Sequence, residues 1–389
     1  MDAEASQPPL AGEPPAPGSP PLTVAPLPPG FELPTARQVV GRGLQLAADH
    51  AADLRRASLY VGLLILATAG PVVLLFLVDL PSLLAFPWTD PSSASQEQAV
   101  AFLAVVGPLY GAGACALLGV VTVSIDGVLV AVALLGSRAV ARPLTLRESI
   151  QRARQVFWRY GVAAFAVGIV STIASTLVGL VTGALGRPES IGSNLLGTLV
   201  ATIVTAPFGY ILTAIVIGDV EAGSALRRSV TLARARPRLA VVVAVFAFLA
   251  STLEVLGIGV AFDVAGEVGT LLHPSLDPSG PGLFLLVPIG AAALVAFGSL
   301  ALTVSAISAA PQITAFLGLT HFSAGLDRAR SPVPAVGEPP EAATELVPVS
   351  AWAAPRAALP RPARWVTIPM LVLVALECLI VAGGLASRP

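Results

Sequence analysis

Apolar residues fill most of this chain in long stretches that carry no charge. Since about 20 apolar residues cross the hydrocarbon core of a bilayer, charge-free stretches of this length predict membrane-spanning helices. Three charge-free intervals, of 22, 27 and 29 residues, lie between Arg56 and Asp79, between Arg159 and Arg187, and between Glu189 and Asp219. Residues 239–262 and 365–387 are similar but are each interrupted by one acid, Glu254 or Glu377. The pattern predicts five spans of ordinary length.

Two further apolar intervals are longer than a bilayer requires. Residues 98–137 contain one acid, Asp126, and residues 283–323 contain none. As a single helix with a rise of 1.5 Å per residue, each is about 60 Å long and projects beyond the membrane. The alternative is a pair of short helices, but neither interval has a polar turn in its middle. We therefore expect one long helix in each, which gives a core of six spans and a seventh span near the C-terminus.

Three segments that precede predicted hairpins have the spacing of amphipathic helices. In two of them apolar residues follow one another at steps of 4, 3, 4 and 3: Leu146, Ile150, Ala153, Phe157 and Tyr160, and Val40, Leu44, Ala47, Ala51 and Leu54. Thr145 with Glu148, and Thr35 with Gln38, have capping-box spacing, which predicts that helices start there. We expect these helices to lie along the membrane surface.

The chain contains an internal repeat. When the sequence is slid by 80 residues, three pairs match: Leu146-Arg147 with Leu226-Arg227, Ser149-Ile150 with Ser229-Val230, and Ala153-Arg154 with Ala233-Arg234. The second helices of the three hairpins correspond as well, with Asp126-Gly127, Pro207 and Pro311 at the same place. The repeat predicts three units, each an amphipathic helix followed by a transmembrane hairpin, with a helix irregularity at this place in every copy.

Composition supports a membrane protein and adds its orientation. The mean hydropathy is +0.83 and only 12% of the residues are charged, against about a quarter in soluble domains. All 22 basic residues are arginine, and 20 of them precede the first span or follow the second, fourth and sixth spans. Positive loops remain in the cytoplasm, so the N-terminus is expected there and the C-terminus outside. The absence of lysine, with much Ala, Gly and Pro, is typical of a GC-rich bacterial genome, so the expected location is the bacterial inner membrane.

Two stretches rich in proline flank the predicted six-span core. Residues 1–36 have no apolar segment of signal-peptide length, so we expect a disordered cytoplasmic tail that is not cleaved. The expected organisation is then a six-helix membrane domain at residues 37–324, a flexible cytoplasmic linker at residues 325–362 and a C-terminal transmembrane helix at residues 363–389. The fold class is all-α.

The segment DVEAGSALRRSVTLARARPRLAVVV, residues 219–243, enters a hairpin directly. In this it resembles a broad group of bacterial six-helix membrane proteins, which includes the membrane domain attached to some glycerophosphodiester phosphodiesterases. The similarity covers residues 30–324. The soluble phosphodiesterase domain of that family, with its catalytic residues, has no counterpart here. The resemblance implies a non-catalytic membrane module.

Three acids inside the predicted spans are candidate functional residues, since a charge at mid-bilayer costs about 2.5–3.5 kcal/mol. Asp126 is expected near the cytoplasmic end of its long helix. Glu254 is deeper and has no obvious basic partner; it acts either as a hydrogen-bonding neutral acid or as part of an ion or proton path, and we favour a structural role. Glu377 is expected to make a polar contact with the core or with another subunit.

Six arginines of the amphipathic segments are candidates for contact with anionic lipid: Arg147, Arg152, Arg154, Arg227, Arg228 and Arg234. Guanidinium groups match phosphate oxygens, so one interpretation is recognition of a phosphorylated ligand or lipid headgroup. Anchoring by the positive-inside rule needs no ligand, and we favour it together with generic lipid contact. A shared ligand site requires the repeat-related arginines to converge on one point.

The motifs of known enzymes are missing from the sequence. It contains neither HExxH nor GxSxG, and its three histidines are widely separated. We expect no cofactor, no metal and no nucleic acid partner. The leading hypothesis is a non-enzymatic membrane module that acts in assembly, scaffolding or envelope maintenance beside a partner protein and membrane lipids. The alternative is a transporter of small solutes or lipids with a cavity between the repeats, lined by Glu254 and Asp126. An intramembrane enzyme ranks third.

Overall fold

A computed structural model describes residues 35–85, 95–139, 143–184, 191–272, 282–330 and 361–386. These residues form helices and their connections. The helices are α1 (Ala36–Asp49), α2 (Ala51–Ala85), α3 (Gln96–Ala139), α4 (Leu146–Ala184), α5 (Ile191–Thr205), the 3-10 helix η2 (Ala206–Phe208), α6 (Ile211–Val216), α7 (Ala222–Ala235), α8 (Pro237–Leu272), α9 (Gly282–Arg330) and α11 (Arg361–Ala386). Among the described residues, seven helices are long and apolar enough to cross a membrane, as predicted. Most of the predicted tail and linker lies outside the described residues.

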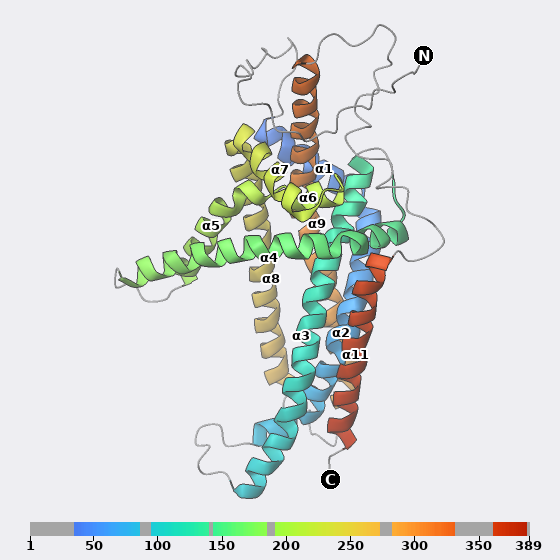
Figure 1. The fold of residues 1–389 in the computed structure, drawn as a ribbon. Coiled ribbons are helices and arrows are strands. Elements are labelled where there is room, and N and C mark those ends of the chain that lie inside the picture. Colours follow the sequence, from blue (N-terminus) through green and yellow to red (C-terminus); the bar gives the residue numbers. More distant parts are fainter. Residues whose placement is uncertain are drawn as a thin grey trace, which may run out of the picture.

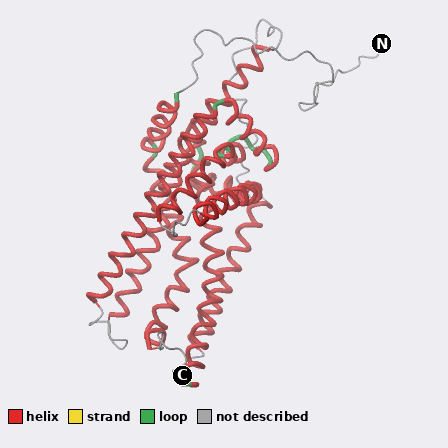
Figure 2. The backbone as a smooth tube through the Cα atoms, turned by 90° about the vertical axis from the view of Figure 1, so that its left-hand side faces the viewer, coloured by secondary structure: helices red, strands yellow, loops and turns green. Residues whose placement is uncertain are grey.

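Four long helices, α2, α3, α9 and α11, run side by side, and α8 packs against α9 (Figure 1; Figure 2). The two long intervals each form one helix, of 44 residues in α3 and 49 residues in α9, as expected. Small residues allow α2 and α9 to approach closely: a Cβ atom on Gly298 would lie 2.9 Å from the Cα atom of Gly62. The Ser299 hydroxyl donates to the Ser58 carbonyl at the same crossing, over 3.1 Å.

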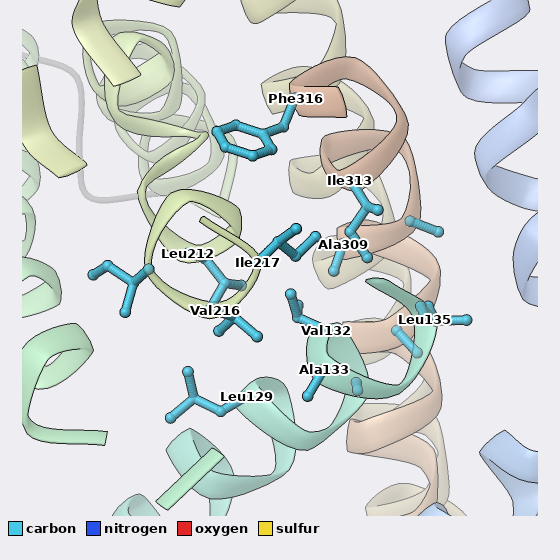
Figure 3. Close-up of a cluster of buried hydrophobic side chains, with 14 of the residues drawn as sticks. Leu129, Val132, Ala133, Leu135, Leu212, Val216, Ile217, Ala309, Ile313 and Phe316 are labelled. Carbon is cyan, nitrogen blue, oxygen red and sulfur yellow. The ribbon is translucent and has the colours of Figure 1, made fainter. Parts of the chain in front are cut away.

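The main hydrophobic core lies at one end of this bundle, which we call the capped end. Here α1, α6, α7 and the first half of α4 surround the end of α3 (Figure 1). Every residue from Leu129 to Ser137 on α3 is buried, and so is every residue of α6. Side chains from α3, α6 and α9 interdigitate there, with Val132, Val216 and Ile313 among them (Figure 3). Segments that are apolar on all sides avoid water, and here other helices enclose them.

Capping boxes start two of the helices at the capped end, as the spacing predicted. The Thr35 hydroxyl accepts from the Gln38 N–H at 3.3 Å, and the Gln38 side chain accepts from the Thr35 N–H at 2.9 Å. Thr145 and Glu148 exchange the same pair of bonds at 3.3 and 2.8 Å. These bonds satisfy N–H groups that a helix start leaves without partners.

The helix α4 runs across the bundle instead of along it, and with α5 it extends away from the other long helices (Figure 1). It is continuous over 39 residues, so its amphipathic first half and its apolar second half form one rod. In contrast, the chain breaks at His50 between α1 and α2, and at Arg236 between α7 and α8. The three predicted units therefore differ in shape, and the threefold repeat stays a prediction.

The helix irregularity predicted for all three hairpins occurs in one. The helix that returns through the second hairpin breaks at Pro207, where α5 gives way to the short helices η2 and α6. Helix α3 is continuous through Asp126 and Gly127, so the expectation was wrong there. It was also wrong at Pro311, because α9 continues through that proline. Pro311 packs against α1 at Gly43, where a Cβ atom would lie 2.6 Å from the Pro311 nitrogen.

Candidate functional site

A buried polar node joins four helices near the capped end. The Arg154 guanidinium on α4 donates to the Tyr60 hydroxyl on α2 over 2.9 Å and to the Thr367 hydroxyl on α11 over 3.0 Å. Its Nε atom lies 3.7 Å from the Asp126 carboxylate on α3. Asp126 is only 1% exposed. The node thus brings together one predicted arginine and one predicted acid that the sequence had placed in different roles.

The geometry of the node indicates that it holds helices together. Neither carboxylate oxygen of Asp126 accepts a hydrogen bond from any described residue, so Arg154 is its electrostatic partner. A buried carboxylate without a nearby cation is costly, because desolvation disfavours its charge. Arg154 therefore balances the charge of Asp126. The Arg154 side chain is 12% exposed and faces protein partners, and its contact with anionic lipid stays a prediction.

Arg152 has a second structural role, at the end of α6. Its Nη2 and Nε atoms donate to the Val216 carbonyl at 2.9 and 3.1 Å, and Nη2 also contacts Asp219 at 3.0 Å. A cation at this position complements the negative end of a helix and satisfies carbonyls that lack intrahelical partners. Asp219 has a φ of 50°, in the left-handed region, and also bonds Arg159 at 3.1 Å. The Arg152 side chain is buried, and its contact with anionic lipid stays a prediction.

The other four candidate arginines do not form a common site. Arg228 lies over the Phe316 ring, with 5.3 Å from its Cζ atom to the ring centre, and burial lowers the pKa of its guanidinium from the ordinary value. The side chains of Arg147, Arg227 and Arg234 are exposed and form no ion pair with another described residue. Because the repeat-related pair Arg154 and Arg234 have different surroundings, the arginines do not converge on one ligand.

Glu377 docks the seventh helix on the bundle. Its carboxylate accepts a hydrogen bond from the Val72 N–H of α2 over 3.1 Å, and the side chain is 1% exposed. Val72 follows Pro71, whose ring disturbs the hydrogen bonding of the helix around it. Helix α11 also packs along α3 and meets α4 through Thr367. Of the two predicted partners, the core or another subunit, Glu377 contacts the core.

Glu254 differs from the other two intramembrane acids. It is half-buried on α8, between the exposed side chains of Leu253 and Val255. It makes no hydrogen bond or ion pair with any residue that the structure describes. Its polar group therefore remains without a partner among the described residues.

Two adjoining cavities flank the helix break at Pro207, and the sequence did not predict their walls. One has a volume of about 420 Å³ and lies between α4, the break and α9. The other has a volume of about 350 Å³ and lies between α5, the break and α8. Neither Asp126 nor Glu254 lines these two cavities. The signal that marks this place in the sequence is the proline at position 207 inside an apolar span.

The break beside these cavities is held by α7. The Ser229 hydroxyl donates to the Pro207 carbonyl over 2.8 Å and accepts from the Tyr210 N–H over 3.1 Å. One side chain thus satisfies two backbone groups that the interrupted helix leaves free. Ser149, the repeat equivalent of Ser229, is also buried, but its hydroxyl makes no hydrogen bond with a described residue.

Metal binding has no support in the described part of the chain, where no three His, Cys, Asp or Glu side chains lie close enough to hold an ion. Of the histidines, His273 and the side chain of His321 fall outside what the structure describes.

Comparison of the chain with protein-family models, with curated proteins and with solved structures finds no match in any of the three.

Proposed function

We propose that this chain is a non-enzymatic, multi-pass module of the bacterial inner membrane that binds a partner membrane protein through α8. In this proposal the arginine-rich capped end faces the cytoplasm, and the C-terminus lies outside. The module serves assembly, scaffolding or envelope maintenance. The resemblance of residues 219–243 to the bacterial six-helix membrane proteins supports a module of this kind, as does the uneven distribution of the arginines.

The observation that carries the proposal is the different use of the three intramembrane acids. Asp126 and Glu377 are buried and hold helices together. Glu254 is half-buried on α8 and has no partner among the described residues. An intramembrane acid without a partner is costly, and such groups pair with polar groups or face a cavity. Since Glu254 lines neither of the two cavities at the Pro207 break, a polar group on a partner helix is the interaction that best accounts for it.

Site-specific photocrosslinking in native membranes tests this proposal. A benzoylphenylalanine at Leu253, which is 70% exposed on α8, should give one discrete adduct with a second protein. The matched control is Leu379 on α11, which is also 70% exposed and should give lipid adducts only. Glu254→Leu should lower the Leu253 adduct at least about fivefold, since a hydrogen bond to a charged or acidic group contributes about 1.5–3 kcal/mol. Glu254→Gln should retain most of it.

Two outcomes contradict the partner proposal. One is lipid adducts alone at Leu253, and the other is the same protein adducts at Leu253 and Leu379. Contact of the exposed Arg147, Arg227 and Arg234 with anionic headgroups belongs to the same proposal. This contact with anionic headgroups should weaken as the salt concentration rises. Replacing any one of the three arginines should weaken it by the same amount.

The second candidate function is transport of a lipid or small solute, and the paired cavities favour it. They lie between the second predicted unit and the helices α8 and α9, where a substrate path between units would run. In this case flux into liposomes that contain the full-length protein should depend on Gln312, which lines both cavities. Glu254 should have no effect on that flux.

A further inference from the structure

The larger of the two cavities at the Pro207 break has a polar wall inside an apolar part of the protein. Six polar side chains from α4, α5 and α9 line it: Tyr160, Ser171, Thr205, Ser305, Ser308 and Gln312. The helices that carry them are among those apolar enough to span a membrane. These six side chains are half-buried, and a hydrogen-bonding group that faces apolar surroundings without a partner is costly.

Four of these six side chains have no hydrogen-bond partner in the part of the chain that the structure describes. Thr205 donates to the Ala201 carbonyl over 2.8 Å, and Ser308 donates to the Ser305 carbonyl over 3.0 Å, so both are satisfied by their own helices. The polar groups of the other four side chains make no hydrogen bond with a described residue; these are Tyr160, Ser171, Ser305 and Gln312. Together they offer three hydroxyls and one amide, each able to donate and to accept.

The smaller cavity continues the site with an apolar wall on the α8 side, while α5 and the break contribute the polar residues Thr198, Thr202 and Tyr210. Both cavities are lined by Val167, Thr205, Phe208, Gly209 and Gln312, so they adjoin at the break. The wall that α8 contributes to the smaller one is apolar apart from Ser251, and consists of Ala240, Val243, Ala244, Ala247 and Phe248. No charged side chain lines either cavity.

We infer that the paired cavities bind one uncharged amphipathic lipid of the diacylglycerol type. Its hydroxyl and ester groups occupy the larger cavity, where the four unpaired side chains bind them, and an acyl chain occupies the smaller one. A charged headgroup finds no ionic partner in these walls, and its desolvation is costly. Water alone fills the polar part but leaves the apolar part empty. The inference does not rest on the partner proposal, since a bound lipid is compatible with a scaffold and with a transporter.

Photolabelling of the full-length protein in phosphatidylcholine nanodiscs tests this inference. The probe is a diacylglycerol with a diazirine in one acyl chain, and labelled peptides are located by mass spectrometry. Labelling should concentrate on α8 near Ala247 and on α9 near Gln312. An excess of unlabelled dioctanoylglycerol should compete with it, and the same amount of dioctanoyl phosphatidylglycerol should not.

Three variants localise the site. Gln312→Leu removes two hydrogen-bonding groups and should lower the competed labelling about tenfold, the effect of losing one or two net hydrogen bonds. Ala247→Phe fills the apolar part and should lower it as strongly while leaving the polar wall intact. Ser308 lines the same cavity, but its hydroxyl already donates within its own helix. Labelling of Ser308→Ala should therefore stay within about twofold of the wild type. Each variant must match the wild type in helix content and monodispersity, and Ala247→Phe decides the result if Gln312→Leu does not.

The opposite results overturn the inference. Labelling that unlabelled diacylglycerol does not displace indicates water in the cavity and ordinary lipid around the protein. Equal competition by phosphatidylglycerol indicates a site for charged lipid. Unchanged labelling in both Gln312→Leu and Ala247→Phe places the lipid elsewhere.

Discussion

The second predicted unit and its two neighbours have similar sequences at their amphipathic segments but different junctions with the following span. In the first unit, α1 ends at Asp49 and α2 begins at Ala51 after a turn at His50. In the third, α7 ends before Arg236, whose φ and ψ of −144° and 71° leave the helical region ahead of Pro237. A residue before proline disfavours the helical conformation, so the chain can turn there. No such residue interrupts α4, so its apolar half continues in the direction of its amphipathic half.

This difference shows that the junction, more than the periodicity, sets the direction of the following span. The segments that begin α4 and α7 share matched residues at a spacing of 80, including Arg154 with Arg234 and Ser149 with Ser229. Their anchoring nevertheless differs. Arg154 is buried in the node with Asp126, and Arg234 is exposed. In the second unit the continuous α4 brings Arg154 to the bundle. In the third unit the break before α8 allows α7 to take a different direction from the span that follows it.

The largest expected effect comes from breaking the node. Arg154→Leu leaves the buried Asp126 without its cation, so the free energy of unfolding should fall by about 3–5 kcal/mol. Arg234→Leu, at the matched exposed position, should change it by less than about 0.5 kcal/mol. Reversible unfolding of the purified protein in mixed micelles measures both. Adding Asp126→Leu to Arg154→Leu removes the unpaired charge and should restore much of the stability. Equal losses for Arg154→Leu and Arg234→Leu contradict the comparison.

The next effect comes from giving the second unit a junction like that of the third. Gly161→Pro introduces a proline inside α4, at a cost of about 3 kcal/mol to a continuous helix, and allows the apolar half to turn. Spin labels at Val181 on α4 and Val260 on α8, both exposed, should then approach each other by more than a helix diameter, about 10 Å. Double electron–electron resonance measures this distance.

Gly161→Ala provides the control for that experiment. A Cβ atom at Gly161 meets no atom within 4 Å, so alanine fits without strain and strengthens the helix by about 1 kcal/mol. The distance between the labels should not change. If Gly161→Pro also leaves it unchanged, contacts elsewhere fix the direction of α4, and the junction does not.

Local patterns predicted the helices well because they depend on neighbouring residues. Apolar length gave seven candidate spans, and the Thr35 and Thr145 spacings gave real capping boxes. The partners of Arg154 were not predictable in this way. Tyr60 and Thr367 are 94 and 213 residues distant in the chain, and they meet Arg154 only because α4 crosses the bundle.

The protein contacts of Arg152 were not predicted for a different reason. The predicted apolar stripe ran through Leu146, Ile150 and Ala153, but the most buried face of α4 also includes Ser149, Arg152 and Val156. Those three residues follow one another at steps of 3 and 4, so they share a face too. An arginine within helical spacing of buried residues was the available signal. The carbonyls that it binds belong to α6, which exists only because the preceding helix breaks at Pro207.

The smallest effect, and the most specific, separates the two matched serines. Ser229→Ala leaves the Tyr210 N–H and the Pro207 carbonyl without partners, so unfolding should become easier by about 1–3 kcal/mol. Ser149→Ala removes a buried hydroxyl that has no partner among the described residues, so stability should stay the same or rise slightly. Thermal unfolding compares the two, and hydrogen exchange of the Tyr210 amide should accelerate in Ser229→Ala alone. Equal effects on stability together with unchanged exchange at Tyr210 would mean that the break holds without α7, and the matched serines would then have the same role in both units.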